Sequence, residues 1–210
     1  MKTKLAAALA AVLVLAAAIP AEAGFHLTLS GGYVLPLDMN QAGAPSYGAG
    51  VGFDLARNIS LDVSVVRYES AVTASTAGLS AGRLAVIPIE VGVNARFPFG
   101  EGKLAAWIGF AGGYGLPQFT YDSAAAAAWT AVGFAVAEKI QGAPCLRDMG
   151  GLEYALSSTA VLRLEARYRM MKPSGSWSMA DLHGGLTQSG TLDNLNLDSL
   201  TLGLAVRIGL

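Results

Sequence analysis

Large apolar residues alternate with small or polar ones over most of the chain after residue 23. The alternation is clearest at the C-terminus, where Leu200–Leu210 reads L-T-L-G-L-A-V-R-I-G-L. Successive side chains of a β-strand point to opposite faces, so a period of two gives this strand one apolar face. At roughly 3.3 Å per residue the strand is about 36 Å long, and a tilt near 40° shortens its reach to about 28 Å. That reach is close to the apolar band of a membrane β-barrel.

The same alternation predicts seven further strands. Together with the last one, they cover residues 25–35, 46–56, 59–65, a segment ending at 99, 103 to about 119, a segment that includes 152–156, 159–171 and 200–210. Short turns at 57–58, 100–102 and 157–158 alternate with four longer loops, as in bacterial outer-membrane barrels. The sequence therefore predicts an all-β fold, an eight-stranded antiparallel up-and-down transmembrane β-barrel over residues 24–210.

Some segments depart from the simple alternation. The Val65-Val66 doublet breaks its phase, which predicts either a β-bulge or the exit of the strand from lipid. Pro88 interrupts the fourth strand and suggests a second bulge. Residues 122–148 fit both a strand and a helical stripe, and we interpret them as a long loop with some local structure. Residues 172–196 are predicted to form a second long, polar loop.

Periodicity alone does not say which face of the barrel is apolar. A soluble barrel of the lipocalin type would point its apolar face inward. Here the face opposite the large residues carries many glycines and alanines together with charges, which suits a narrow interior and favours the membrane version. Outward aromatic residues would then form girdles at the two lipid interfaces. These residues are Phe97, Phe99, Tyr114, Tyr154 and Tyr168.

The first 23 residues have the parts of a secretory signal peptide. Lys2 and Lys4 form a charged start, residues 5–19 an apolar run, and Ala21-Glu22-Ala23 an A-x-A cleavage site. The run is short for a membrane helix, so we expect cleavage before Gly24 and export to the outer membrane of a Gram-negative bacterium. The remaining chain holds 12 Lys+Arg and 14 Asp+Glu, a balance that gives no sign of nucleic-acid binding.

Three segments carry a resemblance to a known group: residues 150–154 (G-G-L-E-Y), 164–169 (L-E-A-R-Y-R) and 198–204 (D-S-L-T-L-G-L). They resemble the small eight-stranded outer-membrane barrel proteins, which include the OmpA barrel domain, OmpX and OmpW, and most of all the OmpW type. The resemblance implies that the last strand is an assembly signal for the barrel-assembly machinery. Gly203, Val206, Ile208 and Leu210 match that signal, although Leu210 replaces the usual terminal aromatic residue. Further implied partners are periplasmic chaperones during biogenesis, and outer-membrane lipid and lipopolysaccharide afterwards.

Most charged residues of the predicted strands share the face opposite the large apolar residues. This predicted lumen network comprises Asp54, Asp62, Glu90, Arg96, Lys103, Glu153, Arg163, Glu165, Arg167, Arg169 and Arg207. The interior of an eight-stranded barrel is just wide enough for side chains to fill it, so we expect opposite charges to pair across the lumen. Such a barrel would have a structural or surface-interaction role. The alternative is a narrow channel for small or hydrophobic solutes, in which the arginines at 163–169 would favour anions.

A third hypothesis is an envelope lipid hydrolase that uses His183, with Asp181 and Ser189 near it in sequence. The chain has no Gly-rich phosphate loop and no Cys/His spacing of a metal site. Its single cysteine, Cys145, cannot form an internal disulfide. We therefore expect a monomer with no catalytic activity, no cofactor, no metal and no nucleic-acid partner.

Overall fold

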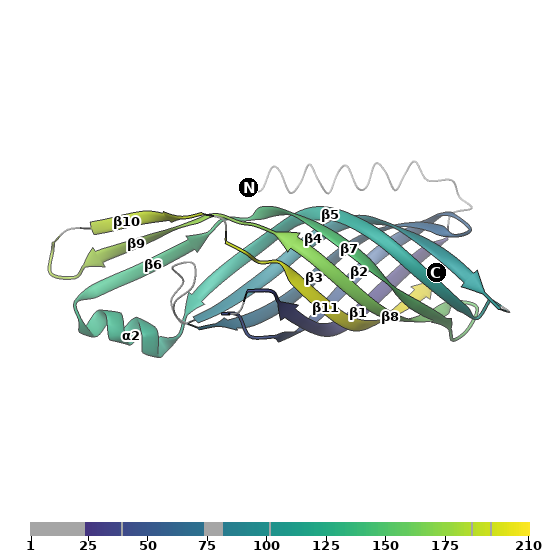
Figure 1. Ribbon diagram of the computed structural model, residues 1–210, viewed down its shortest axis with the longest axis horizontal. Coiled ribbons are helices and arrows are strands. Elements are labelled where there is room, and N and C mark those ends of the chain that lie inside the picture. Colours follow the sequence, from purple (N-terminus) through teal and green to yellow (C-terminus); the bar gives the residue numbers. More distant parts are fainter. Residues whose placement is uncertain (1–23, 39, 74–81, 101, 186, 194) are drawn as a thin grey trace.

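The computed structural model describes residues 24–38, 40–73, 82–100, 102–185, 187–193 and 195–210. Within these ranges eight antiparallel strands close into a barrel, and a three-stranded sheet continues from one rim (Figure 1). The barrel strands are β1 (Phe25–Pro36), β2 (Ala44–Ala56), β3 (Ile59–Val72), β4 (Gly82–Phe99), β5 (Leu104–Tyr121), β7 (Ala143–Ala155), β8 (Ala160–Met171) and β11 (Ser199–Gly209). The predicted eight-stranded up-and-down barrel is confirmed. The predicted signal peptide lies outside the described residues.

The smaller sheet and a short helix form an extension beyond the barrel rim. It consists of α2 (Ser123–Ala131), β6 (Phe134–Ile140), β9 (Gly175–Asp181) and β10 (Thr187–Leu192), with β9 in the centre of the sheet. Figure 1 shows the extension at the opposite end of the molecule from the C-terminus. In the described part of the chain no helix is long and apolar enough to cross a membrane.

These elements correct two predicted loops. Residues 122–148 contain α2, β6 and the first half of β7, and residues 172–196 contain β9 and β10. The strand pattern of the first segment is right for β6, whereas of the helical stripe formed by Trp129, Val132, Val136 and Ile140 only Trp129 lies in α2. The helix precedes Gly133, which has a positive φ of 85°, and the strand follows it.

The barrel closes where β1 pairs with β11. Their register runs without a shift from His26 opposite Gly209 to Pro36 opposite Ser199. The two strands approach closely at a pair of glycines, since a Cβ atom on Gly203 would lie 2.6 Å from the carbonyl oxygen of Gly31. Closure removes the free edges that an open sheet would expose.

Along β3 and β4 the apolar side chains change from the outer face to the inner face. On β3, Val65 faces outward, whereas Tyr68 and Val72 are buried inside the barrel. In this upper part Arg67 and Glu69 occupy the outer face instead. The barrel therefore has an apolar outer face near the short turns and an apolar interior near the extension.

The bulge predicted at Val65-Val66 is absent, because β3 keeps one register with β2 and with β4 on both sides of the doublet. The second predicted interpretation, an exit from lipid, agrees with the change of apolar face there. The bulge predicted at Pro88 is also absent, since β4 and β5 stay in register throughout. Proline lacks the N–H that would pair with β3, so only the hydrogen bonding is interrupted. A register shift occurs instead between Asp54 and Ala56.

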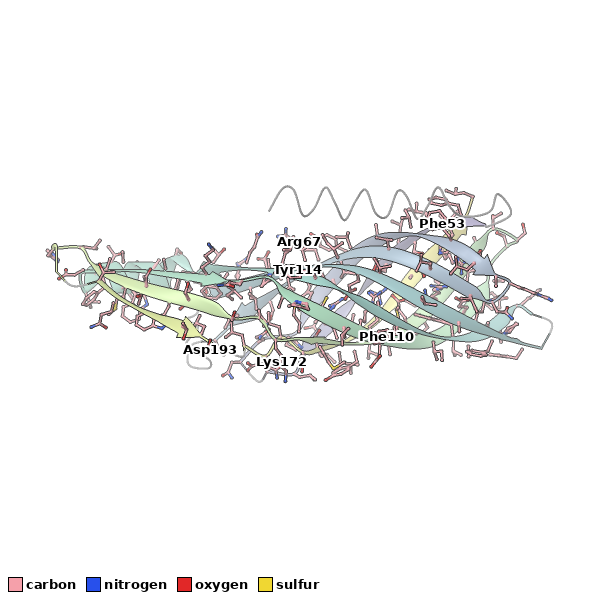
Figure 2. All side chains as sticks on the ribbon, turned by 90° about the horizontal axis from the view of Figure 1, so that it is seen from above. Phe53, Arg67, Phe110, Tyr114, Lys172 and Asp193 are labelled. Carbon is pink, nitrogen blue, oxygen red and sulfur yellow. The ribbon has the colours of Figure 1, made fainter. Side chains whose placement is uncertain are left out.

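Most outward aromatic residues gather at two levels of the barrel, and Phe110 on β5 lies between these levels. Phe25, Phe53, Phe97, Phe99 and Tyr154 lie near the short turns, and Tyr33, Tyr47, Tyr114 and Tyr168 lie farther along the same strands. Figure 2 shows Phe53 toward one end, and Tyr114 level with Arg67 nearer the extension. Eight residues of tilted strand separate Phe25 from Tyr33, a vertical distance of about 20 Å. We call these the phenylalanine belt and the tyrosine belt.

Candidate functional site

The interior between the two belts holds the predicted lumen charges, except for Lys103. Acids and arginines from β2, β3, β4, β7, β8 and β11 point inward because they share the inward parity of their strands. Lys103 lies in the turn before β5 and is exposed. The turn around Gly100 and Gly102, both with positive φ, delays the start of β5 to Leu104, so Lys103 has no inward position.

Glu90 on β4 is the centre of the uppermost ion-pair cluster. Its Oε1 accepts a hydrogen bond from Arg169 Nε at 2.9 Å, and its Oε2 forms an ion pair with Arg147 Nη1 at 2.6 Å. All three side chains are buried. Two guanidiniums around one carboxylate satisfy the buried acid, and they leave one positive charge in excess.

An apolar cluster begins directly beyond Glu90. The thiol of Cys145 lies 3.7 Å from a Glu90 oxygen and itself belongs to this cluster. The cluster consists of Val34, Tyr68, Val72, Leu84, Val86, Ile140, Ala143, Cys145, Met171, Leu192, Leu195 and Leu197, with Phe119 and Trp177 packed against it. Because it combines barrel strands with residues of β6, β9 and β10, it fills the upper barrel and joins the extension to it. We call it the apolar plug.

A second ion-pair cluster lies near the short turns, around Glu153 on β7. The carboxylate accepts a hydrogen bond from Arg96 Nε at 2.7 Å and forms an ion pair with Arg163 Nη2 at 2.6 Å. The guanidinium of Arg163 also lies 4.8 Å from the ring centroid of Trp107, within cation–π range. Asp54 pairs with Arg207 at the same end of the barrel.

His26 joins the lower part of this network. Its Nε2 lies 2.5 Å from Asp62, and its Nδ1 lies 3.7 Å from Asp54. Asp62 also accepts hydrogen bonds from Asn94 and from Ser60. Farther up, Glu165 pairs with Arg167 on the same strand. His26, Asn94 and Trp107 were not in the predicted network, although their inward parity could have placed them there.

Two cavities interrupt the packing of the charged interior. The larger, of about 320 Å³, lies at the short-turn end and is lined in part by turn residues at 57–58 and 157–159. The smaller, of about 40 Å³, lies deeper and is lined by residues that include Arg147, Glu165 and Arg167. We call the larger one the vestibule.

The other predicted site residues are on the surface or on the closing strand. Gly203, Val206 and Ile208 lie in β11, and Leu210 follows it, with its backbone N–H donating to Phe25 at 2.9 Å. Their role as an assembly signal stays a prediction. His183 lies in an exposed turn, 3.4 Å from Asp181. Ser189, in contrast, is in β10 opposite Ser178. Among the described residues no group of His, Cys, Asp and Glu could hold a metal ion.

Comparisons with known proteins agree with the fold. No protein-family model matches the chain, and no curated protein is similar to it in sequence. Among solved structures, Neisserial surface protein A aligns with 89% of this chain and 96% of its own, with a TM-score of 0.55 and 12% identity. The outer membrane protein OprG from Pseudomonas aeruginosa aligns with 89% of this chain and 93% of its own, with a TM-score of 0.56 and 13% identity. The chain therefore has the fold of the small eight-stranded outer-membrane β-barrel proteins.

Proposed function

We propose that this protein is an integral outer-membrane barrel that does not conduct and that presents its extension for interactions at the cell surface. The fold and the two aromatic belts support the location, because such belts flank the apolar band of membrane barrels. The resulting orientation puts the short turns in the periplasm and the extension outside the cell.

The observation that carries the proposal is the apolar plug above the Glu90 cluster. Ions would have to pass the buried cluster of Glu90, Arg147 and Arg169 and then a packed apolar segment. Both are poor environments for a hydrated ion, because the first is filled by buried side chains that already pair with one another and the second offers no polar partner. A closed barrel is a rigid support rather than a pore.

The extension supplies surface suited to an interaction role. The sheet order leaves one edge of β6 and one edge of β10 without a strand partner in the described residues. Large apolar side chains are exposed near its tip, among them Trp129, Val132 and Leu182. Free strand edges and exposed apolar groups are typical of protein-binding surfaces.

A narrow channel is the second candidate, because the vestibule and the smaller cavity both lie in the lower half of the lumen and share the lining residues Asn94, Trp107 and Arg163. That function would require the Glu90 cluster and the apolar plug to open. An enzymatic role has less support, since His183 is exposed and Ser189 lies on another element.

Single-channel recording in planar bilayers separates the two candidates. The closed barrel should give no sustained conductance over the lipid baseline. Double truncation of the plug, Tyr68→Ala with Met171→Ala, should create conductance if the plug is the barrier. Sustained conductance in the unmodified protein, abolished by Arg163→Gln or Arg167→Gln, would support the channel instead.

The partners implied by the resemblance stay part of the proposal. We propose that the protein is a monomer in contact with outer-membrane lipid and lipopolysaccharide, and that chaperones and the barrel-assembly machinery handle it during biogenesis. The covered edges of the closed barrel support a monomer, because no barrel strand needs a partner from another chain.

A further inference from the structure

The vestibule at the short-turn end has the size and charge of a ligand site. Its volume of about 320 Å³ is at the lower end of the range of small-molecule pockets. We propose that the vestibule binds a small anion through its phosphate or carboxylate oxygens. The inference does not depend on the proposed function, since a blind pocket at this end could exist under a closed or a conducting lumen.

The charge of the vestibule favours an anion. Its described lining includes four arginines and two acids: Arg57, Arg96, Arg163 and Arg207 against Asp54 and Glu153. His26 also lines the vestibule. Asp62, which contacts His26 Nε2, adds a third negative charge next to this lining. Asp54, Glu153 and Asp62 balance the three inward arginines, so the excess positive charge of the lining is that of Arg57, which lies exposed in the turn at 57–58.

The arginines keep donors available for a ligand. Glu153 pairs with Nε of Arg96 and with Nη2 of Arg163, so both terminal nitrogens of Arg96 lie outside those pairs. A guanidinium carries five N–H donors in a planar fork that matches the oxygens of phosphate and carboxylate. The side chain of Arg96 is 29% exposed, whereas those of Arg163 and Glu153 are almost fully buried. Arg96 is therefore the arginine best placed to bind the anion.

Hydroxyl and ring groups complete the pocket. Ser60 and the turn residues Ser157, Ser158 and Thr159 line it and offer further hydrogen-bond donors. Trp107 lies on the inner side, fixed under the guanidinium of Arg163 at 4.8 Å. An anion that binds Arg96 and the neighbouring Arg163 would change the surroundings of this indole, which makes Trp107 a built-in reporter.

The test is an anion titration monitored by Trp107 fluorescence. The chain has three tryptophans, so Trp129→Phe and Trp177→Phe leave Trp107 as the reporter. The folded barrel in detergent is titrated with inorganic phosphate, and separately with succinate, at constant ionic strength. We expect saturable binding of at least one probe, and the comparison of the two shows whether phosphate or carboxylate is preferred.

Three variants decide whether binding occurs in the vestibule. Arg96→Gln should weaken the affinity about tenfold, as expected for a lost charge-assisted hydrogen bond. Asp54→Asn should tighten binding, because it removes a negative charge whose side chain is 41% exposed. Arg83→Gln makes the same charge change as Arg96→Gln but on the outer face, and it should leave the affinity unchanged.

The folded state of each variant is checked by its faster migration on a gel without boiling. If Arg96→Gln does not fold, Asp54→Asn still tests the sign of the effect. The proposal is overturned if neither probe binds saturably, if Asp54→Asn leaves the affinity unchanged or lowers it, or if Arg83→Gln weakens binding as much as Arg96→Gln.

Discussion

Val65 and Val66 are consecutive residues of β3, and their side chains lie in opposite environments. Val65 is 43% exposed on the outer face, whereas Val66 is 4% exposed inside the barrel. Toward the short turns the outer face is apolar and the interior charged, and toward the extension the relation is reversed. In the proposed membrane placement, the doublet marks the level at which the barrel leaves the lipid and continues with an apolar core.

The apolar plug should contribute strongly to stability. Leu197→Ala removes a side chain that is 2% exposed, and it should lower the free energy of unfolding by about 3 kcal/mol through lost burial and a residual cavity. Leu202→Ala, on the outer face of β11, is the matched control and should cost less, because lipid or detergent fills the space. Urea unfolding in micelles measures both, and equal losses would contradict a packed plug.

The Glu90 cluster should be sensitive to the loss of its acid. Glu90→Ala leaves Arg147 and Arg169 buried without their carboxylate, which should cost about 3–5 kcal/mol. Glu69→Ala also removes an acid between two arginines, but this acid is 39% exposed, and its loss should cost about 0–1 kcal/mol. The same unfolding assay compares the two variants. Similar values for both would mean that water reaches Glu90.

Closure of the barrel should depend on the glycine contact between β1 and β11. Gly203→Ala would bring a methyl group against the Gly31 carbonyl and should destabilise the barrel by about 2 kcal/mol. A Cβ atom on Gly209 would lie at an ordinary 3.6 Å from Thr159, so Gly209→Ala should be tolerated. The heat needed to convert the compact gel band to the slower one reports the difference. If Gly203→Ala converts at the same temperature as the unmodified protein, β1 and β11 accept the added methyl group without loss of stability, which would contradict a close contact between them.

The proposed orientation predicts which segments are reached from outside the cell. A peptide epitope inserted in the turn at 182–184 of the extension should bind antibody on intact cells. The same epitope in the turn at 157–158 should bind only after the outer membrane is permeabilised. The reverse result would invert the orientation and move the vestibule to the cell surface.

Alternation alone was enough to predict the barrel, because each strand between the belts separates lipid from a narrow interior. It failed at residues 143–148, where the outward set includes Pro144 and Asp148, and the inward set includes Cys145. With Asp148 outside and Cys145 inside, only Leu146 and Arg147 of this part of β7 follow the membrane pattern, which is too short a stretch to predict a strand. The extension could not be predicted for another reason. β6 and β9 are short, and the whole of β7 and β8 lies between them in the sequence, so their pairing leaves no local pattern.

The lumen charges could be placed from parity, but their partners could not. Glu90 and Arg169 are 79 residues apart and lie on strands that are not neighbours in the sheet. Their contact crosses the lumen, so it depends on the closed barrel and on side-chain length, neither of which is a local property of the sequence.

In the proposed orientation, the band of the barrel between the two belts lies in the membrane. The direct measurement is quenching of a single tryptophan by lipids brominated near the bilayer centre, with Trp107, Trp129 and Trp177 replaced by Phe. Val93→Trp, on the outer face between the belts, should be quenched strongly, and Gln118→Trp, toward the extension, should be quenched weakly. Equal, weak quenching at both positions would contradict a membrane-spanning barrel.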